Sequence, residues 1–176
     1  MQADSTPAAA EHRFDEQLAC EAATATGDRL PYEVLMKQRE LLLKQPFAAT
    51  ADGAKNPIIF FSQTRQMVHA NAAALRMIIL HRIEDSVGLR QGELFGCEHK
   101  MSSRPGEVYV CQDCNNMSSL RSALEGRPSR EPRTLIMHDR PDAPRAAFNI
   151  SAVPVSVGQM TFAMVIYEVV DGTMIA

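Results

Sequence analysis

The stretch that decides the fold is NPIIFFSQTRQMVHANAAALRMI, residues 56–78. It contains two short runs rich in apolar and β-forming residues, PIIFF and QMVHA, and the polar residues 62–65 between them suit a hairpin turn. Asn71 follows the second run, and its side chain suits the first position of a helix. Residues 72–80 are apolar nearly all round a helix, as in a buried helix. The stretch therefore predicts a β-hairpin followed by a buried helix.

The end of the chain predicts three more strands. Their sequences are PRTLIMH (132–138), AAFNISAVPV (146–155) and MTFAMVIYEVV (160–170). The last two are joined by a tight turn at Gly158, and residues 118–126 predict a helix that is closed by Gly126. Residues 84–117 have no regular pattern. Two strands, a helical and irregular middle and three strands predict an α+β fold, a five-stranded antiparallel sheet with helices on one face.

Before this core lies LPYEVLMKQRELLLKQP, residues 30–46. Pro31 suits a first helical turn and Pro46 ends the pattern, so an amphipathic N-terminal helix is predicted within residues 29–50. Its apolar side consists of four residues: Val34, Leu35, Leu41 and Leu42. Two interpretations stay open. Either the stripe packs on its own domain, or two copies pair as a short coiled coil and make a homodimer.

The two ends of the chain differ in composition from the core. Residues 1–28 hold six acidic residues, one basic residue and few bulky apolar ones, so we expect a mobile acidic tail. Phe14 and Leu18 have the i, i+4 spacing of a helix, but this stripe is too small to stay ordered without a partner. The predicted organisation is tail 1–28, helix 29–50, core 52–171 and C-terminal tail 172–176.

The core resembles a PAS domain. Residues 56–78 look like the start of that fold, in which two strands precede an Ala-rich helix that begins at an Asn. Residues 146–171, AAFNISAVPVSVGQMTFAMVIYEVVD, are similar to the closing PAS hairpin, with a Pro after its first strand and an acidic residue after its second. The resemblance covers about residues 52–171. It implies a PAS-like sheet and a sensory role in signal transduction, as in two-component systems.

A closer similarity is to a bacterial PAS subgroup that is often fused to histidine kinases. Its marks here are the Gly-Cys-x-His stretch at 96–99 and the Cys-x-x-Cys stretch at 111–114, with LRQGE and LLLKQPFAA upstream. The chain departs from the subgroup at Pro105 and Pro132, where such relatives often have further cysteines. The sequence has no phosphoacceptor helix and no ATP-binding module. We therefore expect a separate protein partner, such as a histidine kinase.

Four candidate metal ligands lie in the irregular middle segment: Cys97, His99, Cys111 and Cys114. Three thiols and one imidazole form a complete set for tetrahedral zinc, and thiolates also suit an iron–sulfur cluster. The Cys-x-x-Cys spacing is the stronger signal, because it lets two sulfurs reach one ion. Two other interpretations stay open, namely a redox-active dithiol of Cys111 and Cys114, and cysteines with no function beyond bracing the segment.

Other cofactors are not expected. Flavin photosensors of the PAS type carry Asn-Cys-Arg-Phe-Leu-Gln, whereas this chain reads FGCEHKM. Haem would need an axial His, for which His69, His81 and His99 are the candidates, but a lone His is more often a surface or core residue. A small ligand would occupy a cavity between sheet and helices, expected near Phe60, Ile78 and Phe148.

Composition narrows the function classes. The chain has 176 residues, of which 45% are hydrophobic and 22% charged, and a net charge of −3, so neither nucleic acid nor an acidic membrane is an expected partner. It shows no signal peptide and no apolar run long enough to span a membrane, so a cytoplasmic location with reduced cysteines is expected. No catalytic motif is present, and we expect no enzyme. The sequence predicts a stand-alone PAS-type sensor; the alternative is an interaction or dimerisation module whose cysteines are structural.

Overall fold

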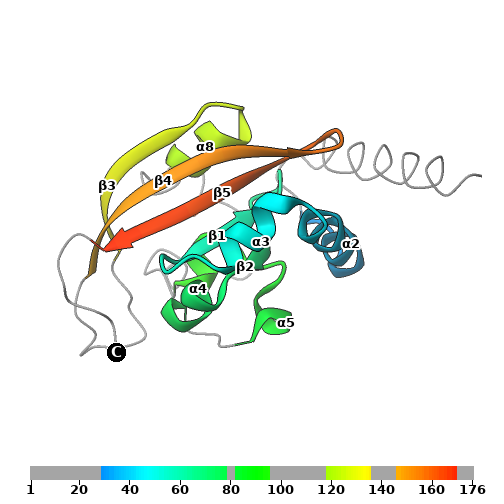
Figure 1. Cartoon of the computed structure of the whole chain (residues 1–176), viewed down its shortest axis with the longest axis horizontal. Helices are drawn as coiled ribbons and strands as arrows, with labels where there is room; N and C mark the ends of the chain where they lie inside the picture. The colour runs from blue at the N-terminus through cyan, green and yellow to red at the C-terminus, as the bar shows by residue number, and fades with distance from the viewer. Residues whose placement is uncertain (1–28, 79–81, 96–117, 136–145, 170–176) are drawn as a thin grey trace, which may run out of the picture.

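A computed structural model of the chain describes residues 29–78, 82–95, 118–135 and 146–169. The predicted tails, 1–28 and 172–176, lie outside these ranges. In chain order the elements are α2 (Tyr32–Leu43), α3 (Pro46–Asp52), β1 (Ile58–Phe61), β2 (Met67–Ala70), α4 (Ala72–Met77), α5 (Ile83–Ser86), α6 (Gln91–Leu94), α8 (Ser118–Leu124), β3 (Ser129–Leu135), β4 (Ala146–Val157) and β5 (Met160–Val169) (Figure 1).

The five strands form one sheet in the order β2-β1-β5-β4-β3, and all neighbouring strands are antiparallel. The first and last strands of the core, β1 and β5, therefore lie side by side in the centre. Tight turns form where the sequence predicts them, since Gly158 between β4 and β5 has a φ of 58° and Gly126 after α8 has a φ of 83°. The predicted α+β fold is confirmed.

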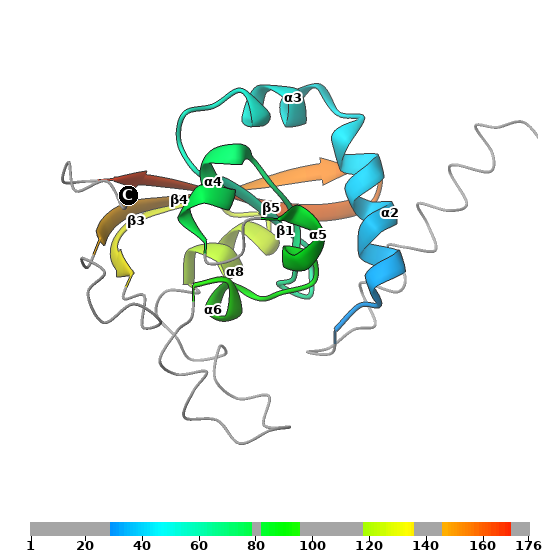
Figure 2. The same ribbon diagram turned by 90° about the horizontal axis from the view of Figure 1, so that it is seen from below.

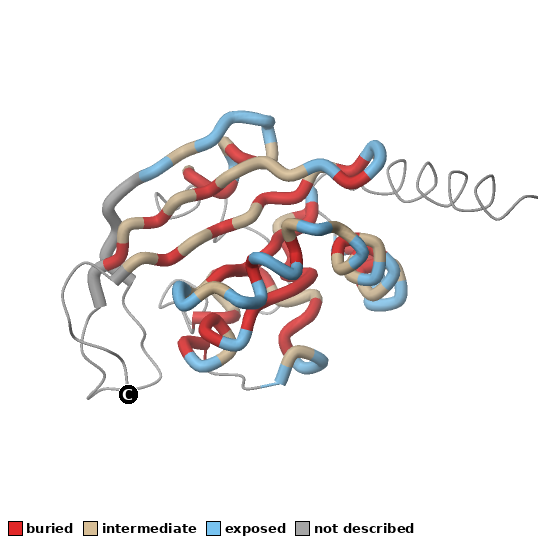
Figure 3. Tube along the Cα trace, in the orientation of Figure 1, coloured by how far each residue is buried: buried red, intermediate tan, exposed pale blue. Residues whose placement is uncertain are grey.

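The helices α4, α6 and α8 lie on one face of the sheet, as predicted for the core, and the N-terminal helices α2 and α3 cover the other face. On the inner face, Ile59 of β1 and Tyr167 of β5 belong to one apolar core with residues of α4, α6 and α8. On the outer face, Phe60 of β1 and Phe162 of β5 belong to a second core with α2 and α3. Figure 2 shows α3 on one side of the sheet, with α6 and α8 on the other. Buried and half-buried residues alternate along β4 and β5 (Figure 3), as expected of strands.

The N-terminal stripe packs on its own chain. Leu35 and Leu42 of α2 are fully buried in the outer core, and Val34 and Leu41 pack against it. Of the two interpretations left open by the sequence, the structure therefore shows the first, in which the apolar stripe packs on its own domain. The region 29–50, which the sequence predicts to hold one helix, contains α2 and most of α3. Pro46 is the first residue of α3, a position where a helix needs no N–H donor, so the proline begins a second helix there.

Residues 84–117 were expected to be irregular, but α5 and α6 lie in the described part of this region and just before it. Each has only four residues, too few to show a helical period in the sequence. They are held by local polar contacts, since the Ser86 hydroxyl donates to Arg82 O at 2.8 Å and the backbone N–H of Arg90 donates to Glu93 Oε2 at 2.8 Å. These two helices could not be predicted from hydrophobic periodicity, because they depend on side-chain contacts that leave no periodic pattern in the sequence.

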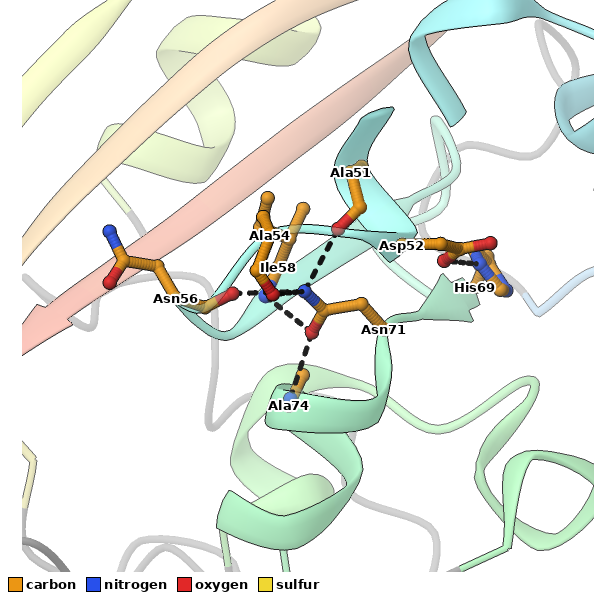
Figure 4. A network of polar contacts seen from close by, with 8 residues as sticks. All are labelled: Ala51, Asp52, Ala54, Asn56, Ile58, His69, Asn71 and Ala74. Carbon is orange, nitrogen blue, oxygen red and sulfur yellow. Dashed lines mark hydrogen bonds and ion pairs between the residues drawn. The ribbon is translucent and has the colours of Figure 1, made fainter. Parts of the chain in front are cut away.

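Asn71 joins three elements through its side-chain amide (Figure 4). Its Oδ1 accepts from Ala74 N at 2.9 Å, which caps α4 as predicted, and from Ile58 N at 3.0 Å, at the start of β1. Its Nδ2 donates to Ala51 O of α3 at 3.0 Å and to Asn56 O at 2.9 Å. Asn71 is buried, so the N–H groups of Ile58 and Ala74 would lose this acceptor if the amide were removed.

We expect Asn71→Ala to lower the free energy of unfolding by about 3 kcal/mol, because it removes a helix cap and leaves buried backbone groups unpaired. Urea denaturation followed by circular dichroism measures this loss. The matched control is Asn56→Ala, since Asn56 is exposed and contributes only its backbone carbonyl to the network. Equal stability of the two variants would contradict the assigned role.

Candidate functional site

The four predicted metal ligands, Cys97, His99, Cys111 and Cys114, lie outside the described residues. The segment that carries them, 96–117, is called the cysteine segment here. Within the ranges that the structure describes, no group of three or more His, Cys, Asp or Glu side chains is arranged to hold a metal ion. The metal site therefore stays a prediction, and the described residues offer no second one.

Described residues on both sides of the cysteine segment belong to the inner core. Phe95, its N-terminal neighbour, is buried and meets the ring of Tyr167 edge to face, with 5.4 Å between ring centroids. At the other end, Leu120 of α8 is buried in the same core. The residue that precedes the cysteine segment is therefore in direct contact with β5.

The inner core also contains a buried polar pair. Gln91 Nε2 donates to Tyr167 Oη at 3.2 Å, while Gln91 Oε1 is buried with no hydrogen-bond partner among the described residues. Burial raises the pKa of Tyr167 well above its ordinary value, although the hydrogen bond from Gln91 opposes this, so the phenol stays neutral. The unpaired acceptor, Gln91 Oε1, is therefore buried at the first residue of α6, the helix that precedes the cysteine segment.

One predicted cavity residue is on the wrong side of the sheet. Ile78 and Phe148 belong to the inner core, as expected, but Phe60 lies in the outer core. Its ring packs on Phe47 of α3, at 6.2 Å between centroids. Successive side chains of a strand point to opposite faces, and in the run IIFF only tertiary structure tells which pair faces inward. The inward pair is Ile59 and Phe61.

His69, one of the haem candidates, lies on β2 in the outer layer. Its Nε2 is 2.8 Å from Asp52 Oδ1 at the end of α3 (Figure 4), and its Nδ1 is buried without a partner in the described part of the chain. Burial lowers the pKa of His69; the hydrogen bond and charge of Asp52 oppose the shift, and the charge of Arg39 adds to it. His69 is therefore neutral at pH 7. His81 and His99 are outside the described residues.

The lowered pKa of His69 predicts a pH dependence of stability. Between its folded pKa and the ordinary value of 6.5 the unfolded chain binds more protons, so stability present above pH 6.5 is lost as the pH falls through this window. The slope is at most about 1.4 kcal/mol per pH unit. In denaturation curves from pH 7 to 5, the stability advantage of the wild type over His69→Gln should shrink. Parallel curves would contradict the neutral, buried imidazole.

A second group of residues ties the start of α2 to the inner helices. We call it the N-terminal junction: Arg29, Leu30, Gln66, Gly88 and Glu93. The Gln66 amide behaves like a strand partner for Leu30, since Oε1 accepts from Leu30 N at 2.6 Å and Nε2 donates to Leu30 O at 3.2 Å. Nε2 also lies 3.2 Å from Gly88 O. Gly88 has a φ of 91°, which favours glycine.

Glu93 completes the junction with both carboxylate oxygens. Oε2 accepts from Arg90 N and so holds the first turn of α6, while Oε1 forms an ion pair with Arg29 Nη2. Arg29 Nη1 donates to Gly88 O at 3.1 Å. One carboxylate, four residues before Cys97, therefore connects the helix that enters the cysteine segment with the chain that enters α2.

Sequence reasoning did not find the junction. Arg29 and Glu93 are 64 residues apart, and Leu30 and Gln66 are 36 apart. Neither pair belongs to a local pattern. Glu93 lies in the stretch LRQGE, which belongs to the resemblance to the cysteine-containing PAS subgroup, and this is the one signal that the sequence carries for the junction.

Comparison with known proteins gives the fold. No protein-family model and no curated protein matches the sequence. Among solved structures, a PAS domain of BvgS from Bordetella pertussis is 18% identical, with a TM-score of 0.52 over 78% of this chain and 89% of that one. A LOV protein of Rhodobacter sphaeroides is 14% identical, with a TM-score of 0.50 over 78% and 70%. These likenesses show that the chain has a PAS-like fold.

No described helix is both long enough and apolar enough to cross a membrane. The similarity to the cysteine-containing PAS subgroup stays a prediction, since the residues that define it lie in the cysteine segment.

Proposed function

We propose that this chain is a PAS-type sensory domain for signal transduction, which reports the state of its cysteine segment to another protein by binding rather than by catalysis. The observation that carries the proposal is the double contact of Glu93, which holds the first turn of α6 with one oxygen and Arg29 with the other. The PAS-like fold, shared with the BvgS domain, supports the same class of function.

The proposed sensing site consists of Cys97, His99, Cys111 and Cys114. Bound zinc or an iron–sulfur cluster would tie together a segment with few apolar residues. In the redox form of the proposal, Cys111 and Cys114 lose two electrons and two protons to a disulfide oxidant, which becomes two thiols. Flavin and haem are not part of the proposal, because the flavin motif is missing and a lone His is more often a surface or core residue, as His69 is in its contact with Asp52.

Two contacts of described residues support a relay from this site. Phe95 packs on Tyr167, so movement at the start of the cysteine segment reaches β5 in the sheet centre. Glu93 pairs with Arg29, so the same movement reaches the chain before α2. The outer layer is thus linked to α6, the helix that precedes the cysteine segment, by contacts just before β2, where Gln66 bonds to Leu30.

The proposed output is a change in binding to a protein partner, such as a histidine kinase, or to a second copy of the chain in the cytoplasm. The alternative is an interaction or dimerisation module whose cysteines only brace the segment. The two functions differ in one property. A sensor changes its self-association or partner binding with metal content or thiol state, and a module does not.

We expect the full chain, purified without oxygen and without a His tag, to contain about one zinc or bound iron, or to carry two thiols that oxidise reversibly as a pair. Elemental analysis with an absorption spectrum and thiol titration of the same sample measure this. Cys111→Ser should remove the metal or the paired oxidation. The matched control is Cys20→Ser, which removes a thiol outside the proposed site.

Failure of the sensor would be seen in two ways. Protein without metal, whose four thiols react independently, would contradict the proposed site. If removing the metal or reducing the disulfide leaves the sedimentation behaviour of the chain unchanged, the result would favour the interaction module over the sensor.

A further inference from the structure

Unpaired buried polar atoms gather where α2 packs on β2. Among the residues that the structure describes, five buried side-chain N or O atoms have no hydrogen-bond partner, and three of them belong to these two elements. They are Gln38 Oε1 and Arg39 Nε of α2, and His69 Nδ1 of β2. Gln38 is buried on the side of α2 that also carries Leu35 and Leu42 of the outer core. Apolar packing therefore holds α2 to the sheet, while the polar groups at this interface are incompletely satisfied.

The ring of His69 has one paired and one unpaired nitrogen. Nε2 lies 2.8 Å from Asp52 Oδ1 (Figure 4), and because a carboxylate only accepts, Nε2 carries the hydrogen and Nδ1 carries the lone pair. The face of the ring stacks on Phe60 of β1, with 6.0 Å between the centroids and 26° between the planes. A second proton on this ring therefore binds at Nδ1.

Burial and two charged groups act on that proton. Burial lowers the pKa of His69, whose side chain is 7% exposed; Asp52 of α3 raises the pKa, and Arg39 of α2 lowers it. The other charged residues on the helices that pack against β2 are exposed, so water screens their charges: Glu33, Lys37, Glu40, Arg76, Glu84 and Asp85. The burial and the Arg39 charge that α2 supplies when packed on β2 therefore disfavour the imidazolium.

The connections of α3 and α2 to the sheet differ. The Asn71 amide donates to Ala51 O of α3, the carbonyl next to Asp52, and so ties α3 to the sheet. Asp52 therefore stays beside His69 when α2 separates, whereas Arg39 moves away with α2. Separation exposes the ring to water and removes a neighbouring cation, and both changes favour the protonated ring.

We infer that His69 is a proton-operated switch for α2, in which a proton taken up at Nδ1 releases α2 from β2 while the sheet stays folded. The proton comes from the solvent, and raising the pH returns α2 to the sheet. The groups involved belong to α2, α3 and β2, so the switch does not require the cysteine segment. It adds acidity as a second input to the position of α2.

Amide hydrogen exchange of the full chain tests the switch. Protection factors, which are exchange rates relative to an unstructured peptide at the same pH, should be lower for residues 35–42 than for β1 and β5, because α2 separates without the sheet. Between pH 7 and 5.5, the protection of residues 35–42 should fall several-fold; the limit for one proton is about tenfold per pH unit. In His69→Gln, whose amide takes no charge, this fall should be absent.

Two arginine variants separate the switch from general effects of acid. Arg39→Met removes the cation that opposes the proton, so the fall between pH 7 and 5.5 should be smaller. The matched control is Arg76→Met, which removes an exposed cation of α4 and should leave the fall as in the wild type. The fall should also persist in Cys111→Ser, so failure of the proposed sensing site and failure of the switch are distinguishable.

Three results would overturn the inference. Equal protection of residues 35–42 and of β5 would mean that α2 separates only when the whole chain unfolds. An equal fall in the wild type and in His69→Gln would assign the effect of acid to another group. Equal behaviour of Arg39→Met and Arg76→Met would show that Arg39 does not act on the proton, and this comparison holds even where His69→Gln does not fold.

Discussion

The side-chain amide of Asn71 is the contact on which the arrangement of this chain depends. It satisfies backbone groups at the end of α3, at the start of β1 and in the first turn of α4, all in a buried place. These elements belong to both faces of the sheet. Because a buried backbone group without a partner costs about 1–3 kcal/mol, the outer helices and the inner helix cannot separate from β1 independently.

The contacts that suit the proposed signalling lie away from Asn71, at the N-terminal junction. The N-terminal junction includes a partly exposed ion pair, a hydrogen bond from Arg29 to Gly88 O and three hydrogen bonds of the Gln66 amide, each of modest strength. Contacts of this kind can be altered without unfolding the core. The cysteine segment begins three residues after Glu93, and α2 begins three residues after Arg29. The proposed sensor thus combines a rigid sheet with an adjustable connection between its two layers.

Sequence reasoning succeeded where the deciding interaction is local. The hairpin around residues 62–65, the cap at Asn71 and the glycine turns follow from short patterns, and together they gave the PAS-like order of elements. It failed where the interaction is long-range. The inward pair of the run IIFF depends on pairing with β5, and the partners of Gln66 and His69 come from distant parts of the chain. The composition of the cysteine segment predicts a site, but spacing alone does not choose between metal and dithiol.

The most direct test of this account is amide hydrogen exchange of residues 29–35 in the full chain, with the cysteine segment in two states prepared by metal loading and chelation, or by reduction and mild oxidation. The account predicts that exchange in these residues differs between the two states in the wild type. It predicts no difference in Glu93→Gln, which can still accept from Arg90 N but loses the charge that pairs with Arg29. Equal exchange in both states of the wild type, or the same difference in both proteins, would contradict it.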